Sequence, residues 1–320
     1  MLILRFRSRG RRTRWSGLFS FFLKRGEGES FLLAERGGGV HFGSMPSYRR
    51  VAVASTFSPT QSALLREALN FARKFGAELE ALHAGERTAE AEARFEECFA
   101  RLEVSLKLHW LTGGVCGEQL LSCLKLGGFD LVVAGALGRE PEMEGRVFNG
   151  SFARRLLREA PCDVLLIPYP SESPPEVVFG VLAVEAGGDV SGEVRGLIER
   201  LGLLRLMLVV SWNPFTEAIA TRLGKEVVDA HEWAERMVGM VGMVGGAGCE
   251  VEARVVDSNT GFGVLDFVAA SGADLLAVRG RMCGGRLVLP SHLSWVEQVI
   301  PTRFLLYGRG WVEDKTGDEV

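Results

Sequence analysis

The sequence lacks the long apolar run that a membrane-spanning helix requires. Such a helix needs about 20 consecutive apolar residues, and the longest run, residues 203–210, is short and interrupted by Arg205. The sequence also lacks an excess of positive charge, because 37 lysines and arginines stand against 40 aspartates and glutamates, a formal net charge of −3. We therefore expect neither a membrane nor a nucleic-acid partner.

Cysteines at metal-binding or redox spacing are missing too. The six cysteines form no C-x-x-C motif, and none lies at zinc-ligand spacing from a histidine. Scattered thiols in a chain of this length are usually small buried side chains in a reducing compartment. We therefore expect no metal site, no disulfide and a cytoplasmic location.

Motifs that would identify an enzyme are absent as well. The sequence contains no Walker A pattern and no H-E-x-x-H pair. Ser151 follows a glycine, but its neighbours do not make the G-x-S-x-G turn that presents a nucleophile. We predict no catalytic residue, and an enzymatic activity has no support from motifs.

What the sequence does contain is enough apolar material for two domains. Hydrophobic residues make up 47% and charged residues 24% of the chain, as in ordinary globular proteins. A length of 320 residues is about twice that of a usual domain. Forty glycines without a G-X-Y period exclude collagen and indicate tight turns.

The first 44 residues differ in charge from the rest. They carry nine arginines and lysines against three glutamates, so this segment has a net charge of +6 and the remainder has −9. Three interpretations are open: a gene-model extension ahead of a native start at Met45, a basic disordered arm, and an export signal with residues 15–23 as its apolar region. A complete domain pattern begins directly after Met45, which favours the first.

From Arg50 onward, short apolar strands alternate with amphipathic helices, a pattern typical of a mainly parallel sheet covered by helices. Ser58, Pro59 and Gln61 favour a capping box at the start of the first helix. Strands are predicted near residues 51–54, 79–83, 104–110, 130–135 and 164–167. Helices are predicted near residues 59–75, 88–101, 117–126 and 151–159.

The pattern restarts after a proline-rich segment. Strands are predicted at 178–184, 206–210, 249–256, 273–277 and 304–307, with helices at 193–200 and 217–240. Asp130 and Asp274 open matching apolar segments, and Pro161 matches Pro301. These matches predict a tandem duplication. The predicted domains are 45–170 and 177–310, with a linker at 171–176 and a tail at 311–320.

Several features occur in the order found in the universal stress protein family, which this chain resembles from about Tyr48 to Gly308. They are the capped helix that ends in Phe75-Gly76, the strand that ends in Leu82-His83, the segment Phe129–Gly135, the pair Gly150-Ser151 and the segment Ala160–Ile167. The resemblance implies two tandem doubly wound open-sheet α/β domains, Rossmann-like and similar to adenine-nucleotide α-hydrolases. Each domain would hold a mainly parallel five-stranded sheet.

Nucleotide-binding members of that family carry a motif G-x2-G-x9-G-(S/T). Its glycines let backbone N–H groups approach phosphate oxygens, and the last pair opens a helix whose N-terminus attracts anions. The matching residues here are Gly135, Gly138, Gly150 and Ser151, although 11 residues rather than nine separate Gly138 from Gly150. The resemblance implies that these four residues bind ATP, with Mg²⁺ where ATP binds.

Other positions depart from the family pattern. ATP-binding members usually end strand one with an aspartate that contacts the nucleotide, and this chain has Ala54 there. The second copy has Arg279 and Met282 at the positions of the first two motif glycines, and Pro290 in place of Gly150. Proline removes one N–H donor, so the second domain is predicted to be degenerate. Glu185 lies near the place of the missing aspartate but is interpreted as a lone carboxylate.

We therefore expect a stress-response protein that binds at most one adenine nucleotide, weakly and in the first domain. One alternative is a slow ATPase that uses the same glycines. The other is a nucleotide-independent scaffold whose Glu140, Glu142 and Glu144 contact an unknown protein partner. His83 is expected to be a packed structural histidine. His109, His231 and His292 are expected to have no special role, because none has an acidic or cysteine partner at motif spacing.

Family members commonly dimerise through their fifth strands. The resemblance therefore implies that residues 164–167 and 304–307 pair within one chain and form an internal pseudo-dimer. Both segments are apolar enough to need covering.

Overall fold

The computed structural model describes residues 48–136, 147–187, 189–212, 218, 221–224, 227–244, 248–257 and 262–308. The predicted extension 1–44, the tail 311–320 and the site residue Gly138 lie outside these residues, as do Glu140, Glu142 and Glu144. Within the described part of the chain, no helix is both long and apolar enough to cross a membrane.

Ten strands form one sheet in the order β3-β2-β1-β4-β6-β14-β10-β7-β8-β9. The first five, here called the first half with their helices, are β1 (Arg50–Ser55), β2 (Glu78–Ala84), β3 (Lys107–Leu111), β4 (Leu131–Gly135) and β6 (Asp163–Ile167). The others, the second half, are β7 (Phe179–Val184), β8 (Arg205–Trp212), β9 (Glu250–Asp257), β10 (Leu275–Arg279) and β14 (Arg303–Tyr307). Both halves have the same internal strand order and parallel pairing, as the predicted fold class requires.

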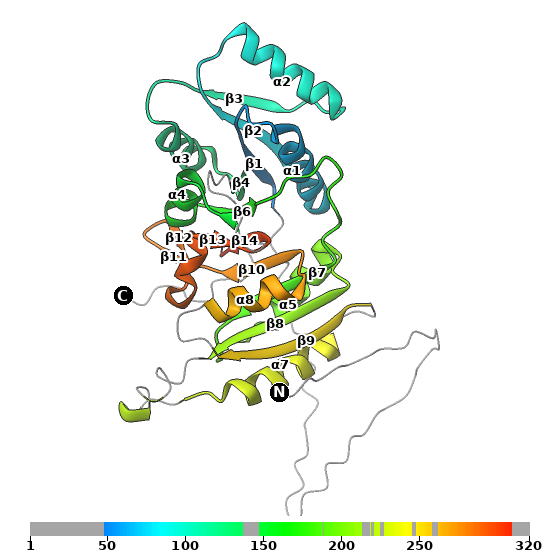
Figure 1. Ribbon diagram of the computed structural model, residues 1–320, viewed down its shortest axis with the longest axis vertical. Coiled ribbons are helices and arrows are strands. Elements are labelled where there is room, and N and C mark those ends of the chain that lie inside the picture. Colours follow the sequence, from blue (N-terminus) through cyan, green and yellow to red (C-terminus); the bar gives the residue numbers. More distant parts are fainter. Residues whose placement is uncertain are drawn as a thin grey trace, which may run out of the picture.

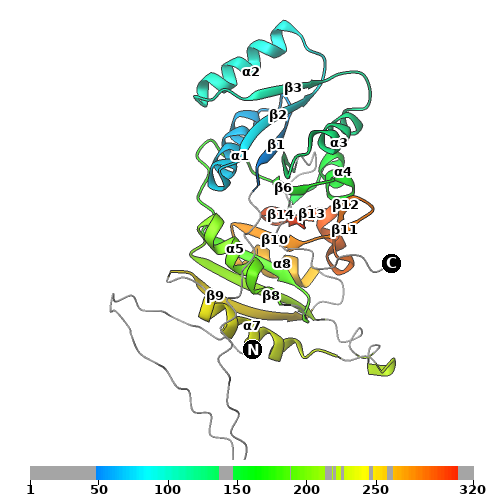
Figure 2. The same cartoon turned by 180° about the vertical axis from the view of Figure 1, so that it is seen from behind.

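Helices cover both faces of this sheet. Neighbouring strand residues such as Ala52 and Val53 belong to different hydrophobic cores, because successive side chains of a strand point to opposite faces. One core contains apolar side chains of α1 (Gln61–Phe75), α2 (Ala89–Arg101), α5 (Ser191–Leu201) and α7 (Ala230–Val244). The other contains those of α3 (Cys116–Gly127), α4 (Ser151–Glu159), α8 (Phe262–Ser271) and the 3₁₀ helix η1 (Ser291–Glu297). Figures 1 and 2 show the halves end to end, with α2 and α7 at opposite ends.

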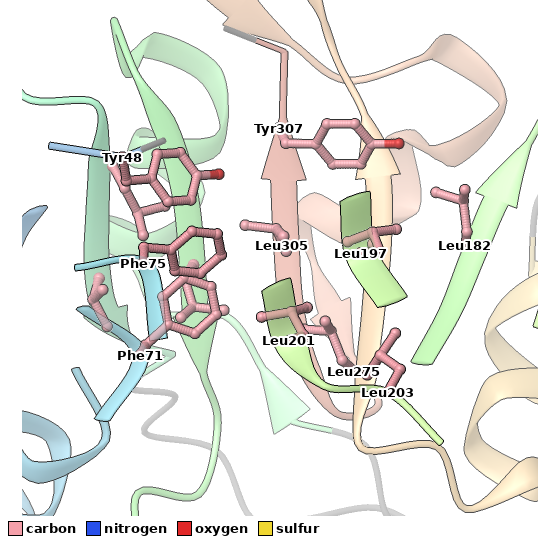
Figure 3. Close-up of a cluster of buried hydrophobic side chains, with 14 of the residues drawn as sticks. Tyr48, Phe71, Phe75, Leu182, Leu197, Leu201, Leu203, Leu275, Leu305 and Tyr307 are labelled. Atoms are coloured by element: carbon pink, nitrogen blue, oxygen red, sulfur yellow. The ribbon is translucent and has the colours of Figure 1, made fainter. Parts of the chain in front are cut away.

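The two halves meet where β6 and β14 pair antiparallel, with Leu166 opposite Phe304 and Val164 opposite Leu306. The segments that the resemblance implied would pair are therefore neighbours in one sheet. Tyr48 and Phe71 from the first half and Leu305 and Tyr307 from the second lie around this junction in Figure 3. A second contact between the halves is the short pair β5 (Val147–Phe148) and β13 (Val299–Ile300).

Matching aspartates hold the first strand of each half. Asp130 Oδ2 accepts hydrogen bonds from the backbone N–H groups of Arg49 and Arg50, at 2.8 and 3.0 Å. Asp274 Oδ2 does the same for Val178 and Phe179, at 3.0 and 2.9 Å. The residue pair that was matched from the sequence thus has the same structural role in both halves.

Four local predictions differ from the structure. Helix α1 begins at Gln61 after Thr60, without a side-chain cap, so the capping box of Ser58 and Gln61 does not form. The helix predicted over 217–240 is interrupted: residues 218, 221 and 222 are helical, Gly224 has a φ of +65° in a turn, and α7 begins at Ala230, where Asp229 Oδ1 accepts the N–H groups of His231 and Glu232. Residues 217, 219–220 and 225–226 of this prediction lie outside the described residues. Strand β3 begins at Lys107 rather than 104, and helix α8 was not predicted.

The segment that follows β10 forms a β-hairpin. Strands β11 (Arg281–Cys283) and β12 (Arg286–Val288) pair antiparallel around Gly284 and Gly285. These two glycines have φ values of +56° and +75°, which two-residue hairpin turns require and which side chains with a Cβ rarely adopt.

Candidate nucleotide site

A pocket lies where the strand order of the first half reverses. The chain runs outward from β1 through β2 to β3, and it returns on the other side of β1 as β4 and β6. The helices that follow β1 and β4 therefore diverge, and a crevice opens at the carboxyl ends of the strands, where such sheets bind ligands. The pocket there holds about 400 Å³ and is lined by Ala54, Ser55, Thr56, Ala84, Val115, Cys116, Gly117, Leu120, Ser151, Phe152 and Arg155.

Two helices begin at this pocket, and neither has a side-chain cap. Helix α3 starts after Val115, whose side chain has no oxygen, and α4 starts after Gly150, which has no side chain. The first N–H groups of both helices are therefore left without the usual side-chain acceptor. Two helix N-termini directed at one space favour an anion there, through their N–H groups and their dipoles.

The remaining walls are largely apolar, with a few polar groups. Ser55 is 2% exposed, and its hydroxyl has no hydrogen-bond partner among the described residues. Arg155 supplies a cation, which ion pairs with Glu159 at 3.2 Å and Glu118 at 3.8 Å hold at the pocket wall. An apolar cavity with a few oriented polar groups is typical of a small-molecule site.

The four residues predicted from the motif have different positions. Ser151 is the first residue of α4 and lines the pocket, and Gly150 directly precedes it with a φ of −63°. Gly135 ends β4 opposite Ile167 and is not among the described residues that line the pocket. Gly138 falls outside the described residues. The structure thus brings the Gly150-Ser151 pair to the crevice, while the loop between Gly135 and that pair is not described.

His83 lies beneath this site as a packed side chain, as expected. Its Nδ1 is 3.0 Å from the carbonyl oxygen of Ser55, and its ring packs against those of Phe57, Phe95 and Trp110. His83 is only 6% exposed and is not among the residues that line the pocket. We therefore assign it to the support of β1 and not to ligand contact.

The second half has a pocket at the corresponding reversal between β7 and β10, with a different lining. It holds about 730 Å³ and is lined by Ala183, Val184, Glu185, Ala186, Gly187, Asp189, Val190, Glu193, Arg279, Gly280, Arg281, Met282, Pro290, His292 and Gly308. Arg279 stands where the first half has Gly135, and Pro290 precedes η1 where Gly150 precedes α4. Charged side chains thus replace the open backbone of the first-half pocket.

Two carboxylates organise the charges of this second pocket. Glu193 is 3% exposed and accepts hydrogen bonds from Tyr307 Oη at 2.7 Å and Arg279 Nη1 at 2.8 Å. Burial raises the pKa of Glu193, against the opposing effect of Tyr307 and Arg279. Glu185 lies 2.7 Å from His292 Nδ1 and 3.4 Å from Arg281 Nη2. The contact with His292 lowers the pKa of Glu185.

One expectation was wrong, and two histidines have acidic partners that lie outside motif spacing. Glu185 is not a lone carboxylate, and His292 does have an acidic partner. His109 has one too, because its Nε2 lies 2.5 Å from Glu80 Oε2. The partners of both histidines are 29 residues or more away in the sequence, so no short motif spacing reveals them. The pairing of β2 with β3 could have identified the contact between His109 and Glu80. Leu82 lies opposite His109 in this pairing, and Glu80 is only two residues before Leu82 on β2.

No family model matches this sequence, and no curated protein matches it. Comparison with solved structures does find similar chains. A functionally unknown protein, PA1789 from Pseudomonas aeruginosa PAO1, is 15% identical with a TM-score of 0.57, over 82% of this chain and 93% of that one. A putative universal stress protein from Pseudomonas aeruginosa UCBPP-PA14 is 13% identical with a TM-score of 0.57, over 82% and 94% of the two chains.

A universal stress protein from Archaeoglobus fulgidus DSM 4304 is 13% identical with a TM-score of 0.52, over 82% of this chain and 98% of that one. At such identities the likeness establishes the architecture and leaves the chemistry to the site itself. The chain has the α/β fold that is found in universal stress protein structures.

Proposed function

We propose that this chain is a stress-response binding protein that takes one adenine nucleotide, with Mg²⁺, in the first-half pocket. The observation that carries the proposal is the convergence of two uncapped helix N-termini, those of α3 and α4, on one pocket of about 400 Å³. Their N–H groups and Arg155 would hold the phosphates. The apolar walls, with the buried hydroxyl of Ser55, would receive the nucleoside.

The second half, in this proposal, supports the fold and binds no nucleotide. Its pocket carries three carboxylates, Glu185, Asp189 and Glu193, against Arg279 and Arg281. A polyphosphate would face repulsion there, because these three carboxylates outnumber the two arginines of the lining. The 3₁₀ helix η1 follows a proline and offers a weaker N-terminus than α4 does.

Binding without rapid turnover fits the described lining of the first pocket. It contains neither a carboxylate nor a histidine that could activate water for attack on a phosphate. We therefore place a binding role ahead of ATP hydrolysis.

The test uses titration calorimetry of the full chain with MgATP, together with Ser151→Asp. An aspartate in the first turn of α4 favours the helix through its dipole, yet it places a negative charge where the phosphates would lie. We expect micromolar binding by the wild type, at least about tenfold weaker binding by Ser151→Asp, and an unchanged or higher melting temperature. Opposite effects on binding and stability would separate loss of the site from loss of the fold.

The matched control is Ser291→Asp, which makes the same change at the first residue of η1 in the second half. It should leave MgATP binding unchanged. The proposal is overturned if the wild type shows no heat up to millimolar MgATP, or if Ser151→Asp binds as tightly as the wild type. Phosphate release measured on the same samples would detect any hydrolysis.

A further inference from the structure

A third cavity lies at the junction between the halves, away from both strand-order reversals. It holds about 340 Å³, a size that is sufficient for a small ligand. It lies between α1 of the first half and the end of α5 in the second, under the proline-rich segment that connects them. Its lining residues are Glu67, Asn70, Phe71, Arg73, Lys74, Leu165, Ile167, Pro174, Pro175, Glu176, Val177, Leu201, Leu275 and Arg303.

The inner walls of this junction cavity are apolar and come from both halves. Phe71 and Leu165 belong to the first half, and Leu201 and Leu275 to the second, and all four are at most 8% exposed as residues. Figure 3 shows Phe71 of α1 on one side of the junction and Leu201 and Leu275 on the other. An apolar cavity is costly to hydrate, so an apolar group that fills it would be favourable.

Polar contacts join the halves around this apolar space. Glu67 Oε2 accepts a hydrogen bond from Arg303 Nε at 2.8 Å, and Glu67 Oε1 accepts one from the N–H of Ser171 at 2.9 Å. Lys74 Nζ donates to the carbonyl oxygen of Leu201, the last residue of α5, at 2.8 Å. The halves are thus tied at the rim of the cavity, while its centre is open.

The rim has an excess of one positive charge. The lining contains three cations and two carboxylates, and Arg303 and Glu67 neutralise each other as a pair. Arg73 is exposed at the end of α1 and has no side-chain partner among the described residues. The hydrogen bond of Lys74, beside Arg73, goes to a neutral carbonyl and not to a carboxylate. A ligand with one negative charge at the rim would complement this arrangement.

We propose that the junction cavity binds a small monoanion with an apolar body, of the class of medium-chain or aromatic carboxylic acids. The apolar body lies between Phe71, Leu201 and Leu275, and the carboxylate lies at the rim beside Arg73 and Lys74. Because the ligand touches both halves, its binding stabilises their docked arrangement. This site is independent of the nucleotide proposal, since the two pockets share no lining residue.

The test uses 8-anilinonaphthalene-1-sulfonate as the probe, an apolar body with one anionic group that fluoresces in apolar surroundings, and decanoate as its competitor. With the full chain we expect saturable fluorescence that decanoate reverses and that decanol, which lacks the charge, reverses less well. Arg73→Glu should weaken probe binding about tenfold, because an attraction at the rim becomes a repulsion. Asn70→Trp, at an exposed lining position, should fill the cavity and remove the signal.

The matched control for charge is Arg236→Glu, on the exposed surface of α7. It makes the same change in net charge away from the cavity and should leave probe binding unchanged. Circular dichroism and melting temperature check that each variant is folded. The proposal is overturned if the wild type shows no saturable signal that decanoate reverses, or if Arg73→Glu and Asn70→Trp, both folded, bind the probe like the wild type. If the probe bound in the nucleotide pocket instead, both folded variants would bind it like the wild type.

Discussion

The two halves of the sheet have the same strand order and place a pocket at the same point, yet the pockets differ in character. In the first half, open backbone at the starts of α3 and α4 meets apolar walls. In the second, Pro290 stands where Gly150 precedes α4, Arg279 stands where Gly135 ends β4, and ion pairs connect the lining residues. The strand order thus sets where a ligand can bind, while a few loop residues determine which ligand is accepted.

The largest effect that we predict is a loss of stability when a contact between the two halves is removed. Glu67 is 5% exposed and holds both Arg303 of the second half and the N–H of Ser171 in the connecting segment. Glu67→Ala leaves a largely buried arginine unpaired, so we expect a loss of about 4 kcal/mol in the free energy of unfolding. Urea denaturation measures it.

The control for this change is Glu172→Ala. Glu172 is an exposed carboxylate of the same segment, 3.5 Å from Arg66, and its loss should cost less than about 0.5 kcal/mol. Two separate unfolding transitions in Glu67→Ala, where the wild type shows one, would mean that the halves can be treated as independent domains. An equal and small loss in both variants would contradict the prediction.

The second prediction contrasts one buried glutamate from each half as the pH changes. Burial alone would raise the pKa of Glu80, but hydrogen bonds from Arg50, His109 and Lys107 outweigh it and lower the pKa to about 2. Ionised Glu80 therefore contributes about 3 kcal/mol above pH 4.5, which is lost as the pH falls towards 2. The free energy of unfolding of the wild type should therefore fall towards that of Glu80→Gln as the pH decreases from 4.5.

Glu193 should behave in the opposite way, because burial raises its pKa. The carboxyl group of Glu193 loses its proton more easily in the unfolded chain than in the folded chain. The contribution of Glu193 to stability therefore declines as the pH rises above 4.5. Urea titrations of Glu193→Gln and Glu80→Gln between pH 3 and 8 should give differences from the wild type with opposite slopes. Slopes of the same sign would contradict this contrast between the halves.

The third and smallest prediction tests whether an acidic group near the end of β1 strengthens the proposed binding of a nucleotide. Ala54 and Ala183 occupy matching positions at the two pockets. Ala54→Asp should tighten MgATP binding about tenfold, as one hydrogen bond between a charged group and the ligand would. Ala183→Asp should produce no binding, since it adds a carboxylate to a pocket that already holds three. Calorimetry that shows weaker binding by Ala54→Asp would mean that electrostatic repulsion dominates at this position.

Much of the fold follows from local patterns in the sequence. The apolar run that forms β4 and the amphipathic segment that forms α4, residues 151–159, were predicted at or within one residue of their ends. Asp130 and Asp274 were matched from sequence because the same residue type, placed just before β4 and β10, accepts hydrogen bonds from the first strand of each half. The single helix predicted over 217–240 missed an interruption, because a turn at Gly224 and the cap at Asp229 break a continuous amphipathic pattern.

The chemistry of the pockets was harder to predict. The positions of Gly150 and Ser151 could be inferred from a motif, but the absence of caps on both α3 and α4 is visible only when their starting residues are known. The pair of Glu185 and His292 joins residues that are more than 100 positions apart, and the junction cavity requires residues from both halves. Side chains that meet only through tertiary packing leave no spacing pattern in one sequence.

The antiparallel contact of β6 with β14 has a consequence for how this protein can diverge. In an assembly of two identical subunits, every substitution occurs twice, so both pockets change together. Here the two partners of the contact belong to one polypeptide, and each substitution enters the assembly once. One half can therefore carry Arg279 where the other carries Gly135, because the shared sheet continues to support both.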